Sequence, residues 1–176
     1  MARRSIFLVL LLLTPTVSFA DTLTENFVLE SRVLGEERPV QVELPDGYDH
    51  GGSYPVVYLL DGGEDWTSQV ADDIHTVRPD LIIVGVANVD RTRDMFPDPV
   101  PAKQGRGGGG WLFLEFLTTE LVPHVEKHFA AGGPGILVGQ SNSGFFTLFA
   151  MIEAPEAFDA FLASSPMIGW DKDLIH

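Results

Sequence analysis

The sequence predicts an α/β protein whose central sheet is mostly parallel. Three apolar runs without alternation, at 55–60, 81–86 and 136–138, are typical of strands that are covered on both faces. Segments with helical character lie between and after these runs. Strands that alternate with helices favour a parallel sheet with helices on both faces, because each helix returns the chain to the same end of the sheet.

Two further strands are predicted ahead of the first apolar run, at 27–33 and 40–44. In the second of them, Val40, Val42 and Leu44 alternate with polar residues, as expected for a strand with one buried face. The segment 35–39 would join the two strands. We therefore expect the sheet to open with an antiparallel pair.

The clearest helical pattern covers residues 112–129. Its apolar residues recur at spacings of three and four and build one stripe: Leu114, Leu117, Leu121, Val125 and Phe129. Pro123 lacks a backbone donor, so it should interrupt and kink this helix. A second helix is predicted over 145–153 and a last short strand over 160–164.

The first 20 residues are typical of a cleaved secretory signal. Two arginines precede an apolar run at 6–13, and Ser18 and Ala20 are small at the two positions that a signal peptidase inspects. The run is shorter than the roughly 20 residues of a spanning helix, so we expect no membrane anchor after cleavage. Residues 21–176 should then form one exported domain, periplasmic or secreted, which is a partial α/β domain.

The composition narrows the possible partners. The chain carries a net charge of −14 and no cysteine, and loss of the first 20 residues would leave nine basic against 25 acidic residues. Such a surface repels nucleic acid, and the basic residues are scattered among acids rather than clustered. Without disulfides an exported domain must be stabilised by its core. Nothing in the composition fixes the oligomeric state.

The segment Gly139-Gln140-Ser141-Asn142-Ser143-Gly144 carries the strongest chemical signal. A serine at a tight turn between a strand and a helix is exposed as a nucleophile, and the residues two before and two after it must be small. Ser143 departs from the usual G-x-S-x-G pattern. Two other interpretations compete: a helix N-cap cluster of Ser and Asn, and an ordinary loop that matches the motif by chance.

Taken together, the motifs resemble the Putative esterase family of α/β-hydrolases, which includes esterase D, enterochelin-type siderophore esterases and mycolyltransferases of the antigen 85 type. The matching segments span residues 55–171 and lie at 57–63, 90–95, 120–128, 139–144 and 164–171. The resemblance implies the α/β-hydrolase fold.

The resemblance also implies hydrolysis of a small-molecule carboxylic ester, with Ser141 as nucleophile and no cofactor or metal. The backbone N–H of Asn142 and a second N–H at Gly63 would form the oxyanion hole. Acyl transfer to an alcohol would use the same residues and remains open. A catalytically inactive scaffold that binds a ligand is the third hypothesis.

The triad of this fold runs in the order serine, acid, histidine. Only 35 residues follow Ser141, and His176, the last of them, is too early for the family's histidine. Asp171 follows a strand at the correct end of the sheet and is a weak candidate for the acid. We therefore expect a chain that lacks the last strands and helices of the fold.

A histidine pair and a glycine-rich loop each have a functional and a purely structural interpretation. His124 and His128 lie four residues apart on the long helix, but the sequence offers no third ligand, so no metal site is predicted. The run Gly105–Gly110 ends a long loop that is either a flexible connection or a wall of the site. In that loop Arg91 and Arg93 are expected to pair with Asp90 and Asp94.

Overall fold

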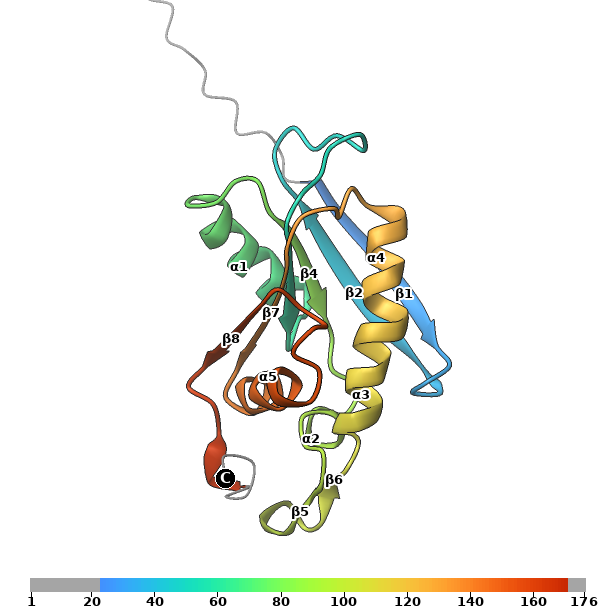
Figure 1. Ribbon diagram of the computed structural model, residues 1–176, viewed down its shortest axis with the longest axis vertical. Coiled ribbons are helices and arrows are strands. Elements are labelled where there is room, and N and C mark those ends of the chain that lie inside the picture. Colours follow the sequence, from blue (N-terminus) through green and yellow to red (C-terminus); the bar gives the residue numbers. More distant parts are fainter. Residues whose placement is uncertain (1–22, 171–176) are drawn as a thin grey trace, which may run out of the picture.

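The computed structural model describes residues 23–170, and their centre is a six-stranded sheet in the order β1-β2-β4-β3-β7-β8 (Figure 1). The strands are β1 Leu23–Ser31, β2 Glu36–Leu44, β3 Val56–Leu60, β4 Ile82–Val86, β7 Gly135–Gln140 and β8 Ala160–Ser164. The last four form a parallel set, and β1 and β2 are antiparallel to their neighbours. The predicted fold class and the antiparallel opening pair are confirmed.

The helices and short elements connect these strands. The α-helices are α1 Glu64–His75, α2 Arg91–Asp94, α3 Gly110–Phe116, α4 Val122–His128 and α5 Asn142–Glu153. Two short strands, β5 Pro99–Val100 and β6 Arg106–Gly107, pair with each other around the 3-10 turn Pro101–Lys103, and a second 3-10 turn covers Ile168–Trp170. The β5–β6 hairpin projects at the end of the molecule where α2 lies (Figure 1).

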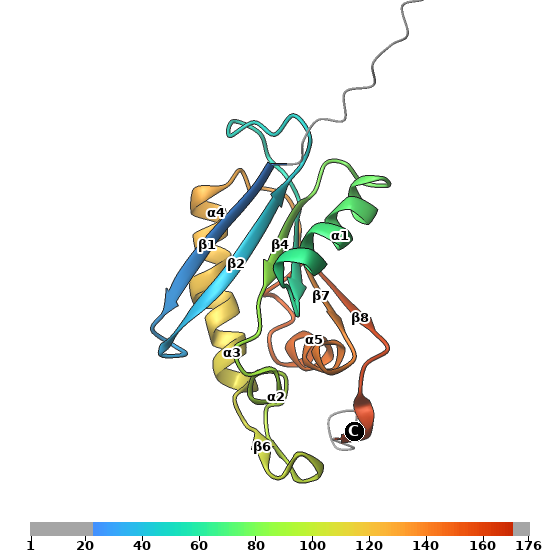
Figure 2. The ribbon, with the colours of Figure 1, turned by 180° about the vertical axis from the view of Figure 1, so that it is seen from behind.

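Helices cover both faces of the parallel strands, as the unbroken apolar runs require. On one face, Val57, Leu59 and Ile83 form a small core with Ala71 of α1. On the other face, the alternate residues of β3 and β4 pack against α3, α4 and α5 in the main core. The helices and the loop before α3 contribute six buried phenylalanines to it: Phe96, Phe113, Phe116, Phe145, Phe146 and Phe149. Figure 2, the reverse of Figure 1, shows α1 on the face opposite to α4.

The opening hairpin turns earlier than the sequence predicts. Its strands pair from Ser31 with Glu36 to Leu23 with Leu44, so residues 36–39 belong to β2 rather than to the turn. Three of these four residues are charged and the fourth is proline, a composition that is typical of a loop. In the fold Arg38 is fully buried, and ion pairs to Glu36 and Asp94 satisfy its charge.

The interruption predicted at Pro123 takes the form of a π-helical turn, Leu117–Leu121, directly before α4. Proline has no N–H to continue the α-helical hydrogen-bond pattern, and π-turns are one way in which a helix absorbs such a break. The turn also places the Glu120 carboxylate against the β1–β2 hairpin, where it accepts from the Ser31 hydroxyl at 2.5 Å and the Arg32 N–H at 3.0 Å.

The last two residues of the glycine run, Gly109 and Gly110, allow close packing at the start of α3. Side chains at Gly109 and Gly110 would collide with Arg93 and with the backbone of Phe96 and Pro97. Gly110 also donates from its N–H to the Phe96 carbonyl at 3.0 Å. Glycine is required here because two backbone segments touch.

The helices within residues 23–170 are too short or too polar to cross a membrane. The predicted signal at 1–20 lies outside the described residues.

Candidate active site

Ser141 occupies a sharp corner between β7 and α5. Its backbone has φ 60° and ψ −114°, a strained conformation that residues with a side chain rarely adopt. β7 ends at Gln140 and α5 begins at Asn142, so the serine is the single residue of the turn. This is the geometry in which a serine hydroxyl is presented at the end of a strand, and it agrees with the predicted elbow.

Backbone hydrogen bonds hold the strained corner from both sides. The Ser141 N–H donates to the Ser164 carbonyl at the end of β8, at 3.0 Å. The Ser141 carbonyl accepts from Phe145 in α5 and from Met167 beyond β8, each at 3.0 Å. Strain of this kind persists only where the surroundings over-determine the conformation. The loop after β8 is therefore part of what forms the corner.

Small residues flank Ser141 for steric reasons. A side chain at Gly139 would collide with the Ser143 carbonyl and the Thr147 hydroxyl, and one at Gly144 would meet the Ser164 carbonyl. Ser143 is fully buried, and its hydroxyl accepts from the Gln140 N–H at 2.9 Å. The departure from the glycine pattern therefore fits within the turn.

Asp61, at the end of β3, joins three loops at this edge of the sheet. Its Oδ1 accepts from Asn88 and from Arg91 Nε, each at 2.7 Å. Its Oδ2 accepts from Arg91 Nη2 at 2.6 Å and from the Ser143 hydroxyl at 2.7 Å. The loops after β3, β4 and β7 thus meet on one carboxylate. This network was not predicted from the sequence, although an aspartate directly after β3, followed by two glycines, indicated a functional loop.

The network keeps Asp61 ionised. Burial raises its pKa, but hydrogen bonds from Arg91, Ser143 and Asn88 and the charge of Arg91 outweigh burial, so the pKa lies below the ordinary value. An ionised acceptor strengthens each of these hydrogen bonds. Asp61 also has a left-handed φ of 61°, so its backbone is strained immediately before Gly62 and Gly63.

The two predicted oxyanion donors follow β3 and β7, which are neighbours in the sheet. Asn142 is nearly buried at the first turn of α5, and its N–H has no hydrogen-bond partner within residues 23–170. Gly63 is exposed before the first turn of α1, with no atom within 4 Å of the place that a Cβ would occupy. The Asp61–Ser143 hydrogen bond brings these two loops together.

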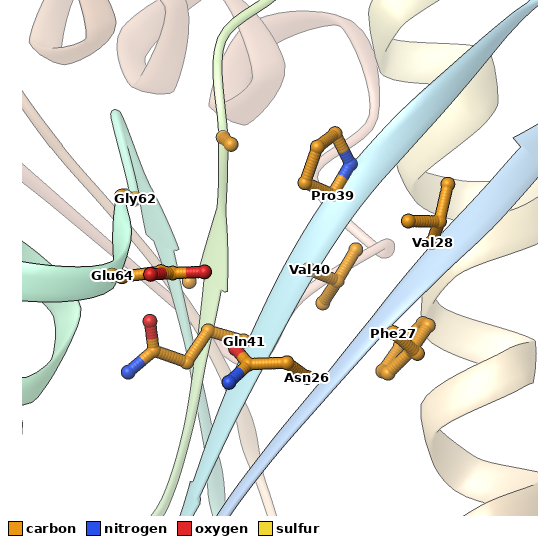
Figure 3. A pocket seen from close by; sticks show the side chains of 11 residues that line it. Asn26, Phe27, Val28, Pro39, Val40, Gln41, Gly62 and Glu64 are labelled. Carbon is orange, nitrogen blue, oxygen red and sulfur yellow. The ribbon is translucent and has the colours of Figure 1, made fainter.

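Two cavities adjoin this edge. One of about 480 Å³ is lined by Asp61, Gly139 and Gln140 and by Trp66 and Val70 of α1. The other, of about 180 Å³, is lined by Gly62 and Gly63 and by residues of β1, β2 and β4; Figure 3 shows the side chains of Gln41 and Glu64 beside it. Ser141 is not among the residues that line either of these two cavities.

The arginine pairings are partly as predicted. Arg93 pairs with Asp94 at 2.7 Å and also with Glu36 at 2.6 Å. Arg91 pairs with Asp61 and not with Asp90, whose partner is Arg106 at 2.8 Å. Arg91 lies 30 residues after Asp61 in the chain, so sequence proximity did not reveal this pair.

The four histidines among the described residues make their contacts away from the elbow. His50 contacts Tyr48, His75 lies 2.8 Å from the Leu81 carbonyl, and the rings of His124 and His128 stack. Residues 23–170 hold no group of three side chains that could bind a metal ion. The predictions for Asp171 and His176 fall outside the described residues.

The sheet order, the helices on both faces and a serine at a strained strand-to-helix corner define an α/β-hydrolase. Among solved structures, an IroE-like serine hydrolase from Shewanella oneidensis is 31% identical with a TM-score of 0.74, over 85% of this chain and 52% of that one. BES protein from Bacillus cereus shares the fold with a TM-score of 0.77 and 24% identity, over 99% of this chain and 68% of that one. The family described as Putative esterase matches residues 31–174, and the chain belongs to it.

Two curated relatives are similar over most of the chain. The siderophore triacetylfusarinine C esterase of Aspergillus fumigatus is 29% identical over 171 residues, covering 85% of this chain and 57% of its own length. The ferri-bacillibactin esterase BesA of Bacillus subtilis is 27% identical over 176 residues, covering 86% of this chain and 61% of its own length. The chain thus spans less than two thirds of the length of either relative.

Proposed function

We propose that this chain is a serine hydrolase of small-molecule carboxylic esters, with Ser141 as the nucleophile. The observation that carries the proposal is the strained backbone of Ser141, which has a φ of 60°. Beside it, the Asn142 N–H has no hydrogen-bond acceptor among the described residues. The names of the curated relatives support a siderophore-type ester as the substrate.

In the proposed reaction the Ser141 Oγ attacks the ester carbonyl carbon and loses its proton to a base. The carbonyl oxygen becomes an oxyanion, which accepts hydrogen bonds from the N–H groups of Asn142 and Gly63. Each such donor lowers the barrier by roughly 3 kcal/mol. The bond to the alcohol then breaks, the alcohol takes the proton, and water hydrolyses the acyl-enzyme. No described histidine contacts Ser141, so the base is assigned to none of residues 23–170.

The test compares the wild-type chain with Ser141→Ala in hydrolysis of p-nitrophenyl acetate. We expect Ser141→Ala to lose at least about 1000-fold in kcat, because the covalent route is removed. Ser53→Ala is the matched control: Ser53 is an exposed serine in the loop before β3 and should keep wild-type rates. Equal rates for wild type and Ser141→Ala would remove Ser141 from the mechanism.

We further propose that the protein is exported and cleaved after Ala20, on the basis of the signal-like sequence at 1–20. Mass spectrometry of the protein expressed with its natural leader should give a chain that begins at Asp21. A product that retains residues 1–20 in the soluble cell fraction would contradict export.

A further inference from the structure

Ser143 stands where the usual elbow pattern has glycine, and its hydroxyl is fully bonded. Its Oγ accepts from the Gln140 N–H and lies 2.7 Å from Asp61 Oδ2 and 2.8 Å from the Gln140 carbonyl. A hydroxyl has a single proton to donate. The ionised carboxylate is the stronger acceptor, so the proton is directed to Asp61.

This hydrogen bond joins the two halves of the proposed site. Ser143 lies in the first turn of α5, two residues after Ser141, whereas Asp61 directly precedes Gly62 and Gly63. Asp61 has a left-handed backbone, so the orientation of its carboxylate is coupled to the path of the chain into Gly63. Arg91 completes the link, because it holds the same carboxylate at 2.6 Å and reaches the Gln140 carbonyl at 3.4 Å.

We propose that Ser143 is a positioning residue, whose hydrogen bond to Asp61 fixes the Gly63 N–H relative to the Ser141 hydroxyl. The proposal rests on the proposed function, in which these two groups act on one carbonyl. Oxyanion donors contribute only when they are held at the correct distance before the reaction. Glycine at 143 would leave Asp61 without one of its donors and the Gln140 N–H without its side-chain acceptor.

The kinetic test uses Ser143→Ala in the full chain with p-nitrophenyl acetate. Loss of the link should lower kcat about tenfold, because the oxyanion donor is less well held, and leave KM within about twofold. Thr147→Val is the matched control. Thr147 is also a buried hydroxyl of α5, but it bonds the Ser143 carbonyl and has no link to Asp61. Wild-type kcat in Ser143→Ala would overturn the proposal.

A second measurement does not depend on activity. Nuclear magnetic resonance should show lower order parameters for the Gly62 and Gly63 N–H groups in Ser143→Ala than in wild type or Thr147→Val. The carboxylate pKa of Asp61 should rise in the same variant, since a donor to its ionised form is gone. If Ser143→Ala does not fold, Ser143→Gly, which restores the pattern residue, takes its place.

The two measurements separate the two proposals. Equal hydrolysis by wild type and Ser141→Ala would refute the proposed nucleophile, and the resonance data would still decide whether Ser143 orders the Gly63 loop. Unchanged order parameters at Gly62 and Gly63 would refute the positioning role even in an active enzyme.

Discussion

At Gly139 the turn leaves no space for a side chain, because a Cβ would overlap the Ser143 carbonyl and the Thr147 hydroxyl. Gly63 is the opposite case: its φ of −134° suits any residue, and the space beside its Cα is empty. Gly139 lies near the end of β7 and Gly63 lies in the loop after β3, and glycine is suited to the two positions for different reasons. The first is required by packing, and at the second only the backbone N–H matters for the proposed chemistry.

Gly139→Ala should therefore lower the free energy of unfolding by about 2 kcal/mol, the usual cost of forcing atoms into a filled core. Gly63→Ala is the matched control and should stay within about 0.5 kcal/mol of wild type. Urea unfolding at neutral pH measures both values. A Gly139→Ala protein as stable as Gly63→Ala would contradict the packing described for the turn.

Asp61 makes the edge of the sheet sensitive to acid. Its pKa is below the ordinary aspartate value, so its contribution to stability is present above the unfolded pKa of about 4 and is lost as the pH falls through the folded pKa. Asp61→Asn should lower the free energy of unfolding at pH 7 by about 2 kcal/mol, because charge-assisted hydrogen bonds are lost.

The difference in the free energy of unfolding between wild type and Asp61→Asn should narrow as the pH falls below about 4, because the unfolded wild-type chain then binds a proton at this carboxyl. The difference should disappear once the pH is below the folded pKa, which is the lower of the two. Urea unfolding at pH 7 and pH 3 measures this change. Asp80→Asn is the control, since Asp80 pairs with Arg78 on the exposed surface. A constant difference across the pH range would show that Asp61 is not the titrating group.

Among the elements, β2 and α2 are joined by a cluster of two arginines and two acids, of which Arg38 and Asp94 are fully buried and Glu36 and Arg93 are partly exposed. The charges balance, and the rings of Phe113 and Phe116 lie 5.2 and 5.9 Å from the Arg38 guanidinium. Removing Asp94 would leave the buried charge of Arg38 with one acidic partner in place of two.

Asp94→Asn should therefore lower the free energy of unfolding by about 3 kcal/mol. Asp98→Asn removes an exposed acid from the same loop and should have no measurable effect. Thermal and urea unfolding of both variants check the expectation. Equal stability would mean that the cluster does not join β2 to α2.

The helices and strands that were predicted correctly from the sequence are those with a local residue pattern. The apolar runs identified β3, β4 and β7, and the motif around Ser141 identified the corner, because both signals lie within a few adjacent residues. The start of β2 was wrong, since Glu36 and Arg38 pair with Arg93 and Asp94, which lie more than 50 residues further along the chain. The Asp61–Arg91 pair and the packing role of Gly109 were missed for the same reason.

At the scale of the whole molecule, β8 is one edge of the sheet within residues 23–170, where its partner strand is β7. It carries no charged residue, and Leu162 in its middle is 58% exposed. The opposite edge, β1, contains Glu25 and Glu30, which discourage pairing with another chain. An uncharged edge strand with exposed apolar side chains favours self-association.

Leu162→Glu should lower the fraction of self-associated protein several-fold, because a charge on the edge opposes strand pairing. Leu112→Glu is the matched control, since Leu112 is also half exposed but lies on α3, away from any strand edge. Light scattering over a range of concentrations measures the difference. Equal scattering by the two variants would exclude β8 as the associating edge.

The ties from Ser141 to Ser164 and Met167 also matter for protein engineering. Transplanting the hexapeptide Gly139–Gly144 into another scaffold would not reproduce the corner, because two of its anchors come from more than 20 positions downstream. A minimal fragment that keeps Ser141 at its strained φ of 60° must extend at least through Met167. Proteolytic cleavage between α5 and β8 should let the Ser141 backbone leave its strained conformation, although the cut lies outside the turn.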